Sequence, residues 1–293
     1  MIWFGLAFLS ALLSAAAAIM QKKILFRMTA LEFSFLVSVL TVALCALIPL
    51  AVDVTSVSGP TLAIMLAKSV LSAAAFLLVM MSLERNQISS ALPLLGLTPA
   101  ITALLSLAAT GEMLRGWEWG GIALMMGGTY LVERKPGNLG LRPFREVIAA
   151  RSHRPIIGAL LLFAVTSVVD KSLLTGYAVK PLVVLFYQQA VYCLVFGAMV
   201  WIRMASFRGV IAKAKEQLPL ILAVALLTVA YRLSQLEATR DAPVALVLAI
   251  KRTSILYATF FGGKMFSEDR LRMKLLGGAL IIASGFVILR NVA

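Results

Sequence analysis

The sequence predicts an all-α membrane protein with ten transmembrane helices, arranged as two inverted five-helix repeats. Three observations lead to this fold class. First, 61% of the 293 residues are hydrophobic and the mean hydropathy is +0.97, whereas soluble domains hold about 45–50% apolar residues. Second, the chain contains ten long apolar runs. Third, short sequence matches recur in the same order in its two halves.

The ten apolar runs each approach the roughly 20 residues that a helix needs to cross a bilayer. The first run lacks the basic start of a signal peptide, so we interpret it as a retained span. The fourth run contains Pro93, Gly96 and Pro99, and membrane helices tolerate such breaks where neighbours satisfy the freed backbone groups. The predicted runs are 2–21, 32–52, 60–82, 88–109, 116–133, 155–177, 181–202, 217–236, 242–263 and 273–290.

The longest polar stretch, residues 133–154, separates five runs from the other five. It divides the chain into a first five-helix repeat, residues 1–137, a linker, residues 138–154, and a second repeat, residues 155–293. Within the linker, residues 143–154 are either a short amphipathic helix on the membrane surface or a solvated connection. The sequence leaves both alternatives open.

Several short motifs of the first half recur in the second half in the same order, which indicates a duplication. Because five is an odd number, the second copy enters the membrane upside down relative to the first. Inverted repeats of this kind are common in secondary transporters. The matches are residues 19–25 with 168–174, Leu83-Glu84 with Leu236-Glu237, Ala91-Leu92 with Ala245-Leu246, and Gly120-Gly121 with Gly277-Gly278.

The loop charges predict an orientation. The loops after the first, third, fifth, seventh and ninth runs hold eighteen Lys and Arg residues, and the opposite side holds four. The positive-inside rule then places both termini on the non-cytoplasmic side of an integral, multi-pass protein of the cell membrane, the inner membrane in a bacterium. The same loops account for the net charge of +14, so we expect membrane lipids and no nucleic acid as partners.

Charged residues inside spans are costly and indicate function. Lys251 and Arg252 are the clearest case, because they lie about nine residues, or about 14 Å of helix, into the ninth run. Their neighbours Ala249, Ile250 and Ile255 offer no partner. We therefore predict that this pair binds substrate.

The other charged residues within spans are Lys68, Asp170, Lys171 and Arg232. With Lys251 and Arg252 they make five cations and one carboxylate, an excess that favours a water-filled cavity which receives an anion. Asp170 is the candidate counter-ion or proton-coupling residue. Alternatively, Lys171 and Arg232 lie near span ends and extend to the membrane surface, and Asp170 neutralises Lys251 or Arg252.

Polar aromatic and amide side chains add further candidates. Tyr187, Gln188, Gln189 and Tyr192 give the seventh run a polar stretch at mid-depth, and Tyr231 and Tyr257 lie in later runs. Such groups either bind a substrate by hydrogen bonds or hold helices together. The complete set of predicted substrate-binding residues is Lys251, Arg252, Arg232, Lys68, Lys171, Gln188 and Tyr257.

The sequence contains no catalytic or metal-binding pattern. His153 is the single histidine, and Cys45 and Cys193 lie within apolar runs without metal-ligand spacing. No P-loop or Ser-His-Asp set is present. We therefore expect a protein that is not an enzyme and that needs no metal or cofactor.

Glycines recur seven residues apart in the fifth and tenth runs, as Gly120 with Gly127, Gly121 with Gly128, and Gly278 with Gly285. Small residues on one helical face allow close packing in membranes. They suit either a neighbouring helix or a partner chain, so a homodimer through these two helices stays open.

The first half carries, in order, Ala91-Leu92-Pro93, then Leu97-Thr98-Pro99-Ala100, Gly111-Glu112 and Gly120-Gly121. This series resembles the repeat unit of the EamA-type domain in the drug/metabolite transporter superfamily. The second half is similar, with Ala245-Leu246, Ser267-Glu268 and Gly277-Gly278, but it has Lys251-Arg252-Thr253 where the first half has Leu97-Thr98-Pro99.

The resemblance implies ten helices, a central cavity between the repeats and alternating access without ATP. It implies substrates among amino acids, other metabolites, drugs, nucleotide sugars and lipid-linked sugars. The fourth and ninth helices help to line the cavity in this family, which favours Lys251 and Arg252 as site residues. Ten-helix members usually have cytoplasmic termini, whereas the loop charges of this chain predict the opposite.

Three functions agree with these features. The first is a secondary transporter for a small anionic or zwitterionic metabolite, bound in a central cavity lined by basic residues. The second is a flippase or transporter for a phosphate-bearing lipid or a lipid-linked sugar. The third is a membrane scaffold or sensor that transports nothing, against which the density of charge at mid-membrane argues.

Overall fold

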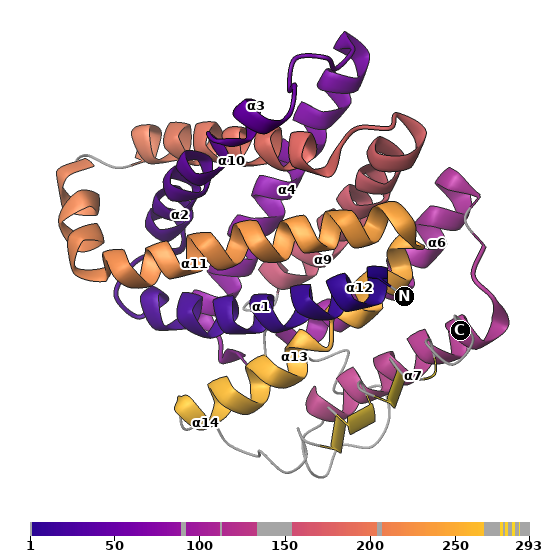
Figure 1. The fold of residues 1–293 in the computed structure, drawn as a ribbon. Coiled ribbons are helices and arrows are strands. Elements are labelled where there is room, and N and C mark those ends of the chain that lie inside the picture. The colour runs from indigo at the N-terminus through magenta and orange to yellow at the C-terminus, as the bar shows by residue number, and fades with distance from the viewer. Residues whose placement is uncertain are drawn as a thin grey trace.

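The computed structural model describes residues 2–88, 92–111, 113–133, 154–203 and 207–266, together with 276, 277, 279, 280, 283, 284 and 287. Every element assigned in this part of the chain is a helix (Figure 1). The linker, most of the tenth predicted run, Glu112, and Ser267-Glu268 lie outside the described residues. The predictions made for them are therefore untested.

The first half begins with three long helices and continues with shorter ones. Thr29 caps α2 by a reciprocal capping box with Glu32, and Gly111 ends α6 with a left-handed φ of 66°. The elements are α1 Ile2–Leu25, α2 Ala30–Cys45, α3 Ile48–Ala51, α4 Gly59–Arg85, the 3₁₀ helix η1 Leu92–Leu97, α6 Thr98–Thr110 and α7 Gly116–Glu133.

The second half also contains long helices, with interruptions where α-helix passes into π-helix. The elements are α9 Arg154–Lys171, the π-helix η3 Ser172–Gly176, α10 Pro181–Arg203, α11 Phe207–Asp241, α12 Val244–Lys251, α13 Ser254–Tyr257, the π-helix η4 Ala258–Gly262 and α14 Gly263–Met265. The predicted eighth run ends at 236, whereas α11 continues to Asp241 and includes Glu237 and Arg240 beyond that point.

Seven segments of the described chain are long and apolar enough to cross a membrane: Ile2–Leu25, Ala30–Ala51, Gly59–Arg85, Arg154–Gly176, Pro181–Arg203, Ala214–Asp241 and Val244–Met265. They correspond to the predicted runs one to three and six to nine. The fourth run forms a shorter apolar helix, Leu94–Ala109, and the fifth forms α7. The all-helical fold is thus confirmed, and the count of ten spans stays a prediction.

Helix contacts between the halves come in matched pairs. The helix α1 packs along α11, just as α4 packs along α9, and α2 contacts α11 as α10 contacts α4 (Figure 1). The helices α2 and α10 contact each other, and so do α6 and α12. If α1, α2, α4 and α6 are exchanged for α9, α10, α11 and α12, each of the first four contacts becomes its matched contact, and the α2–α10 and α6–α12 contacts stay the same.

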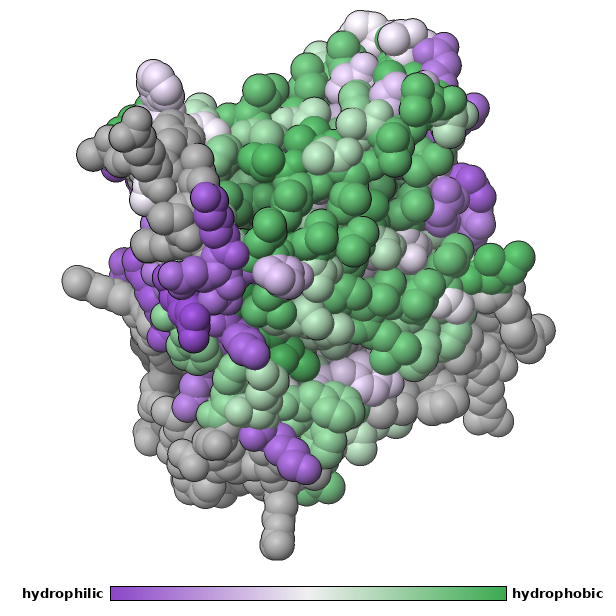
Figure 2. Space-filling model, turned by 60° about the vertical axis from the view of Figure 1, so that its left-hand side comes forward, coloured by the Kyte–Doolittle hydropathy of each residue, from purple (hydrophilic) through white to green (hydrophobic). Residues whose placement is uncertain are grey.

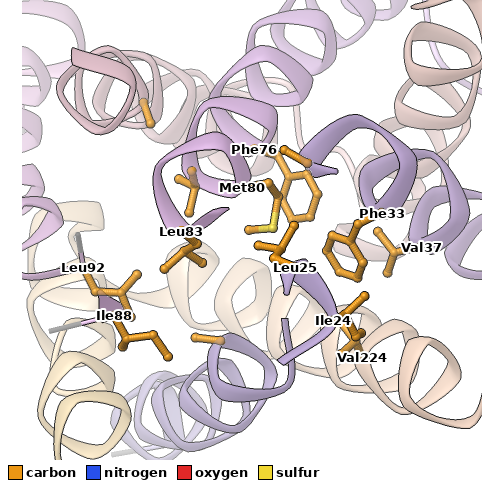
Figure 3. Packing of buried hydrophobic residues seen from close by; sticks show 14 of the residues in the cluster. Ile24, Leu25, Phe33, Val37, Phe76, Met80, Leu83, Ile88, Leu92 and Val224 are labelled. Carbon is orange, nitrogen blue, oxygen red and sulfur yellow. The ribbon is translucent and has the colours of Figure 1, made fainter. Parts of the chain in front are cut away.

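The largest hydrophobic core lies where the two halves meet. It includes Phe33, Phe76 and Met80 from the first half, and Phe196 and Val224 from the second. Figure 3 shows Phe76, Met80 and Leu83 of α4 directed toward Leu25 and the residues around it. The core therefore joins the halves into one helical body.

Apolar side chains also cover much of the outer surface. The view in Figure 2 shows a broad hydrophobic face, with hydrophilic residues gathered toward its margins. Large apolar side chains such as Leu71, Leu161 and Leu194 are exposed on the molecular surface. Exposed apolar area of this extent suits contact with lipid, and with the seven apolar segments it identifies an integral, multi-pass membrane protein.

Candidate functional site

A cavity of about 150 Å³ lies between the two halves. Its walls come from α1, α4 and η1 on one side, and from α9 to η4 on the other. The polar lining residues include Gln21, Thr166 and Ser167 as well as Gln188, Arg232, Gln235, Lys251 and Arg252. Four of the predicted substrate-binding residues, Arg232, Gln188, Lys251 and Arg252, therefore line one cavity.

A charged cluster lies behind this wall. Asp170 on α9 forms two ion pairs. One carboxylate oxygen lies 2.7 Å from Lys68 Nζ, and the other lies 2.5 Å from Arg232 Nη2. Lys68 and Asp170 are each 2% exposed, so this is a buried ion triad that ties α4, α9 and α11 together. Asp170 thus pairs with Lys68 and Arg232. The alternative prediction, that Asp170 neutralises Lys251 or Arg252, is wrong for the described structure.

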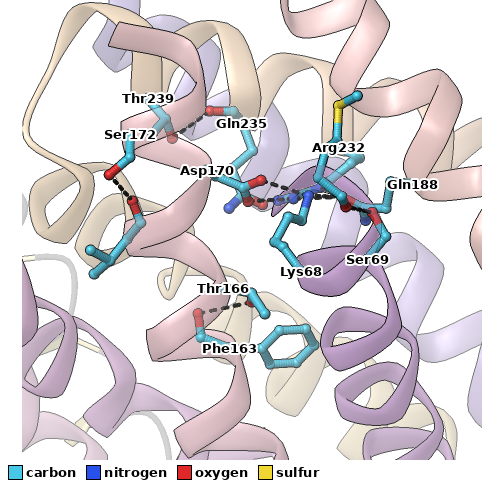
Figure 4. A network of polar contacts seen from close by, with 12 residues as sticks. Lys68, Ser69, Phe163, Thr166, Asp170, Ser172, Gln188, Arg232, Gln235 and Thr239 are labelled. Carbon is cyan, nitrogen blue, oxygen red and sulfur yellow. Dashed lines mark hydrogen bonds and ion pairs between the residues drawn. The ribbon is translucent and has the colours of Figure 1, made fainter. Parts of the chain in front are cut away.

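Gln188 on α10 completes this cluster. Its side-chain oxygen accepts hydrogen bonds from Lys68 Nζ at 2.8 Å and from Arg232 Nη2 at 2.8 Å, and its amide nitrogen donates to Tyr192 Oη at 3.2 Å. Figure 4 shows Lys68, Asp170, Arg232 and Gln188 converging from four helices. Gln188 holds the two cations in place and reaches the cavity wall.

Lys251 and Arg252 have different surroundings. Lys251 Nζ donates to Gln235 Oε1 and lies 4.8 Å from the centroid of the Tyr231 ring. Arg252 Nη2 donates to Thr98 Oγ1 at 3.0 Å, and Arg252 Nε is buried without a hydrogen-bond partner. Within the described chain no carboxylate forms an ion pair with either residue, so both cations have neutral partners only.

The backbone is interrupted at both ends of the Arg252–Thr98 contact. The α-helical hydrogen bonding of α12 stops at Lys251 and resumes at Ser254, and the 3₁₀ helix η1 passes into α6 at Thr98. Short 3₁₀ stretches inside helices often mark functional hinges. Thr98 is also the residue that the sequence aligned with Arg252, so the contact joins matching positions of the two halves.

Lys171 does not line the cavity. Its ammonium donates to the backbone oxygens of Thr239 at 3.0 Å and Ala242 at 2.9 Å, at the carboxyl end of α11. Lys22, its match in the first half, donates to the oxygens of Leu83 at 2.6 Å and Asn86 at 2.9 Å, at the end of α4. A cation at a helix carboxyl end is favourable, so this geometry suits helix capping.

Three of the predicted polar aromatic and amide residues hold helices or loops together. Gln189 Oε1 accepts from Thr41 on α2 at 3.0 Å, and Tyr187 Oη donates to the backbone of Val54 at 3.0 Å. Tyr257 lies edge-on to Phe8, with 6.4 Å between ring centroids, outside the cavity lining. Lys68 likewise lies behind the lining.

The sequence reasoning did not single out Gln235 or Thr98 as site residues. Gln235 lies one helical turn after Tyr231 and accepts a hydrogen bond from Lys251. Its amide side chain inside an apolar run could have identified it as a site residue. Thr98 was visible only through its alignment with Arg252.

Gly120 and Gly127 of α7 have no close neighbours, whereas Gly121 and Gly128 are buried. A Cβ added at Gly120 or Gly127 would meet no described atom within 4 Å. Packing within the described chain therefore does not require a glycine at position 120 or 127, and a homodimer through α7 stays a prediction.

Comparison with known proteins supports the resemblance found in the sequence. Residues 1–134 match the model of the EamA-like transporter family, which confirms the resemblance over the first half. No match was found among curated proteins. One solved crystal structure of a protein aligns with 97% of this chain and 95% of its own, with a TM-score of 0.72 and 16% identity. At that identity the likeness concerns the fold alone.

Proposed function

We propose that this protein is a secondary transporter that moves a small anionic metabolite across the membrane by alternating access, with Lys251 and Arg252 as its substrate-binding cations. One observation carries this proposal: among the described residues, two cations meet only neutral partners at a cavity between the halves. A charge in a low-dielectric interior is costly unless an opposite charge compensates it. A bound anion supplies that compensation.

The buried triad has a supporting role in this proposal. Lys68 and Arg232 share the single charge of Asp170, so the triad keeps one net positive charge beside the cavity. Arg232 reaches the lining, whereas Lys68 does not. Because both oxygens of Asp170 contact cations, Asp170 acts as a counter-ion and Gln188 orients the two cations.

The matched helix pairs support alternating access by two inverted repeats. Each of Lys22 and Lys171 caps the helix that leads to the cavity-lining segment of its own half. The two caps lie at opposite ends of the bundle, because Ala7 of α1 packs with Ala242, whereas Lys22 lies fifteen residues, or about 22 Å, further along α1. Exchanging the conformations of the halves would exchange which end of the cavity is closed.

The test is uptake or efflux of radiolabelled anions by proteoliposomes that contain the purified protein. Acetate, phenylacetate and inorganic phosphate serve as probes. We expect the double variant Lys251→Gln, Arg252→Gln to lower the rate of anion movement at least tenfold while its thermal unfolding stays cooperative. Lys23→Gln, which removes an exposed cation of α1, is the matched control. Equal rates in the double variant and the control would disprove this proposal.

A further inference from the structure

We propose that the transported anion is amphipathic: an anionic head at Lys251 and Arg252 joined to an apolar body of about one ring, without an ammonium group. This inference rests on the proposed function and names its substrate class.

The cavity has an apolar wall beside the charged one. Phe76, Val79 and Met80 of α4, Leu95 of η1 and Ile255 of α13 line it, and all of them belong to the main hydrophobic core. Figure 3 shows Phe76 and Met80 on one helix and Leu92 on a neighbouring segment. Water in contact with such a wall has few partners, so an apolar group is the favourable occupant.

The apolar part of the lining extends away from Lys251 along the chain. Lys251 is the last residue of α12, seven residues after its start at Val244, which follows the end of α11. Met80 lies five residues before the end of α4 at Arg85, on the side where Lys22 caps that helix. Ile255 and Ala258 follow Lys251 by four and seven residues, which is about 6–10 Å of helix. That spacing separates the head of a small organic anion from its body.

The size of the cavity limits the body to about one ring. A protein cavity of about 150 Å³ with apolar walls accommodates benzene, whereas pockets for drug-sized ligands measure roughly 300–1,000 Å³. The volume here is about 150 Å³. It therefore fits a single-ring or short branched organic anion, and it is too small to enclose a nucleotide sugar or a lipid-linked sugar.

The described lining offers no carboxylate to pair with an ammonium group. None of the described residues that line the cavity is an acid, and Asp170 lies behind the wall with both oxygens on cations. An ammonium placed beside Arg232, Lys251 and Arg252 would be repelled. The charge of the described site thus favours an anion over the zwitterion that the sequence left open.

The experiment measures ligand-induced thermal stabilisation of the full chain in detergent, because a ligand that binds the native state raises its apparent stability. The probes are phenylacetate, its neutral isostere phenylacetamide, the head alone as acetate, and the zwitterion phenylalanine. We expect phenylacetate to bind at least tenfold more tightly than each of the other three. Phenylacetate uptake by proteoliposomes is measured in parallel.

Two variants of the apolar wall test the body of the ligand. Met80→Gln keeps length and adds an amide, and Val79→Thr keeps shape and adds a hydroxyl. We expect each to weaken phenylacetate binding about three- to tenfold, because part of the favourable burial of the ring is lost. Acetate has no ring, so its binding should stay unchanged. Val79→Thr keeps the test usable if Met80→Gln does not fold.

The outcomes separate the two proposals. If acetate binds as tightly as phenylacetate, and the double variant Lys251→Gln, Arg252→Gln loses that binding, the amphipathic class is wrong and anion transport stands. If phenylacetamide or phenylalanine matches phenylacetate, the requirement for a purely anionic head is wrong. If no anion stabilises the protein against thermal unfolding and none is taken up by the proteoliposomes, both proposals fail.

Discussion

Replacing Asp170 by Asn removes the single carboxylate of the buried triad and keeps the shape of its side chain. The variant leaves Lys68 and Arg232 facing each other, with Gln188 as their remaining described acceptor. Lys68 is 2% exposed, so it cannot recover hydration without rearrangement of α4. We expect this single change to destabilise the folded protein strongly.

The magnitude follows from the two contacts of the carboxylate. At an effective dielectric constant of about 20, opposite charges at the 2.7 Å between Lys68 and Asp170 attract by about 6 kcal/mol. The 2.5 Å contact of Arg232 contributes a similar amount, and desolvation of the ions offsets much of both. Breaking a buried pair by removing one partner costs about 3–5 kcal/mol, which we take as the expected loss.

For a chain of this size each kcal/mol lowers Tm by roughly 2–4 °C, so Asp170→Asn should lower it by roughly 6–20 °C in a thermal unfolding assay in detergent. The double variant Asp170→Asn, Lys68→Met removes one cation together with the carboxylate and should regain at least half of that loss. Glu237→Gln, which breaks the exposed pair with Arg240, is the control and should cost less than about 1 kcal/mol.

A shift for Asp170→Asn no larger than that of Glu237→Gln would refute the reasoning. So would a double variant that is less stable than Asp170→Asn alone, since it would mean that Lys68 is not the group left uncompensated.

Three further changes give measurable outcomes. Thr98→Val removes the acceptor of Arg252, so it should destabilise the ligand-free protein by about 1–3 kcal/mol and increase the relative stabilisation by phenylacetate; an unchanged Tm would contradict this. Lys22→Met and Lys171→Met each remove charged hydrogen bonds to a helix end, and each should cost about 1.5–3 kcal/mol; a loss in only one of them would argue that the halves are not equivalent. Ala178 is exposed and has a φ of 52°, so Ala178→Gly should stabilise the protein by about 1 kcal/mol, and a lower Tm would show that the left-handed conformation carries no strain.

Local composition was enough to predict the helical class. An apolar run of twenty residues has no alternative to a helix in lipid, because its backbone groups must bond within the segment. The interruptions within runs were harder to predict. The end of α12 at Lys251 and the π-helices η3 and η4 depend on packing against neighbouring helices, and no proline or glycine stands at Lys251 to mark the first of these breaks.

The sequence by itself determined that this chain is an all-helical membrane protein with an excess of cations inside its spans, because hydrophobicity and charge are properties of the residues themselves. Only the tertiary structure decided which cation meets which partner. Asp170 contacts residues that lie 102 positions before it and 62 after it, and those contacts depend on how α4, α9 and α11 are rotated about their axes. The same packing leaves Lys251 and Arg252 with neutral partners at the cavity, and it places Lys171 at the end of a helix instead.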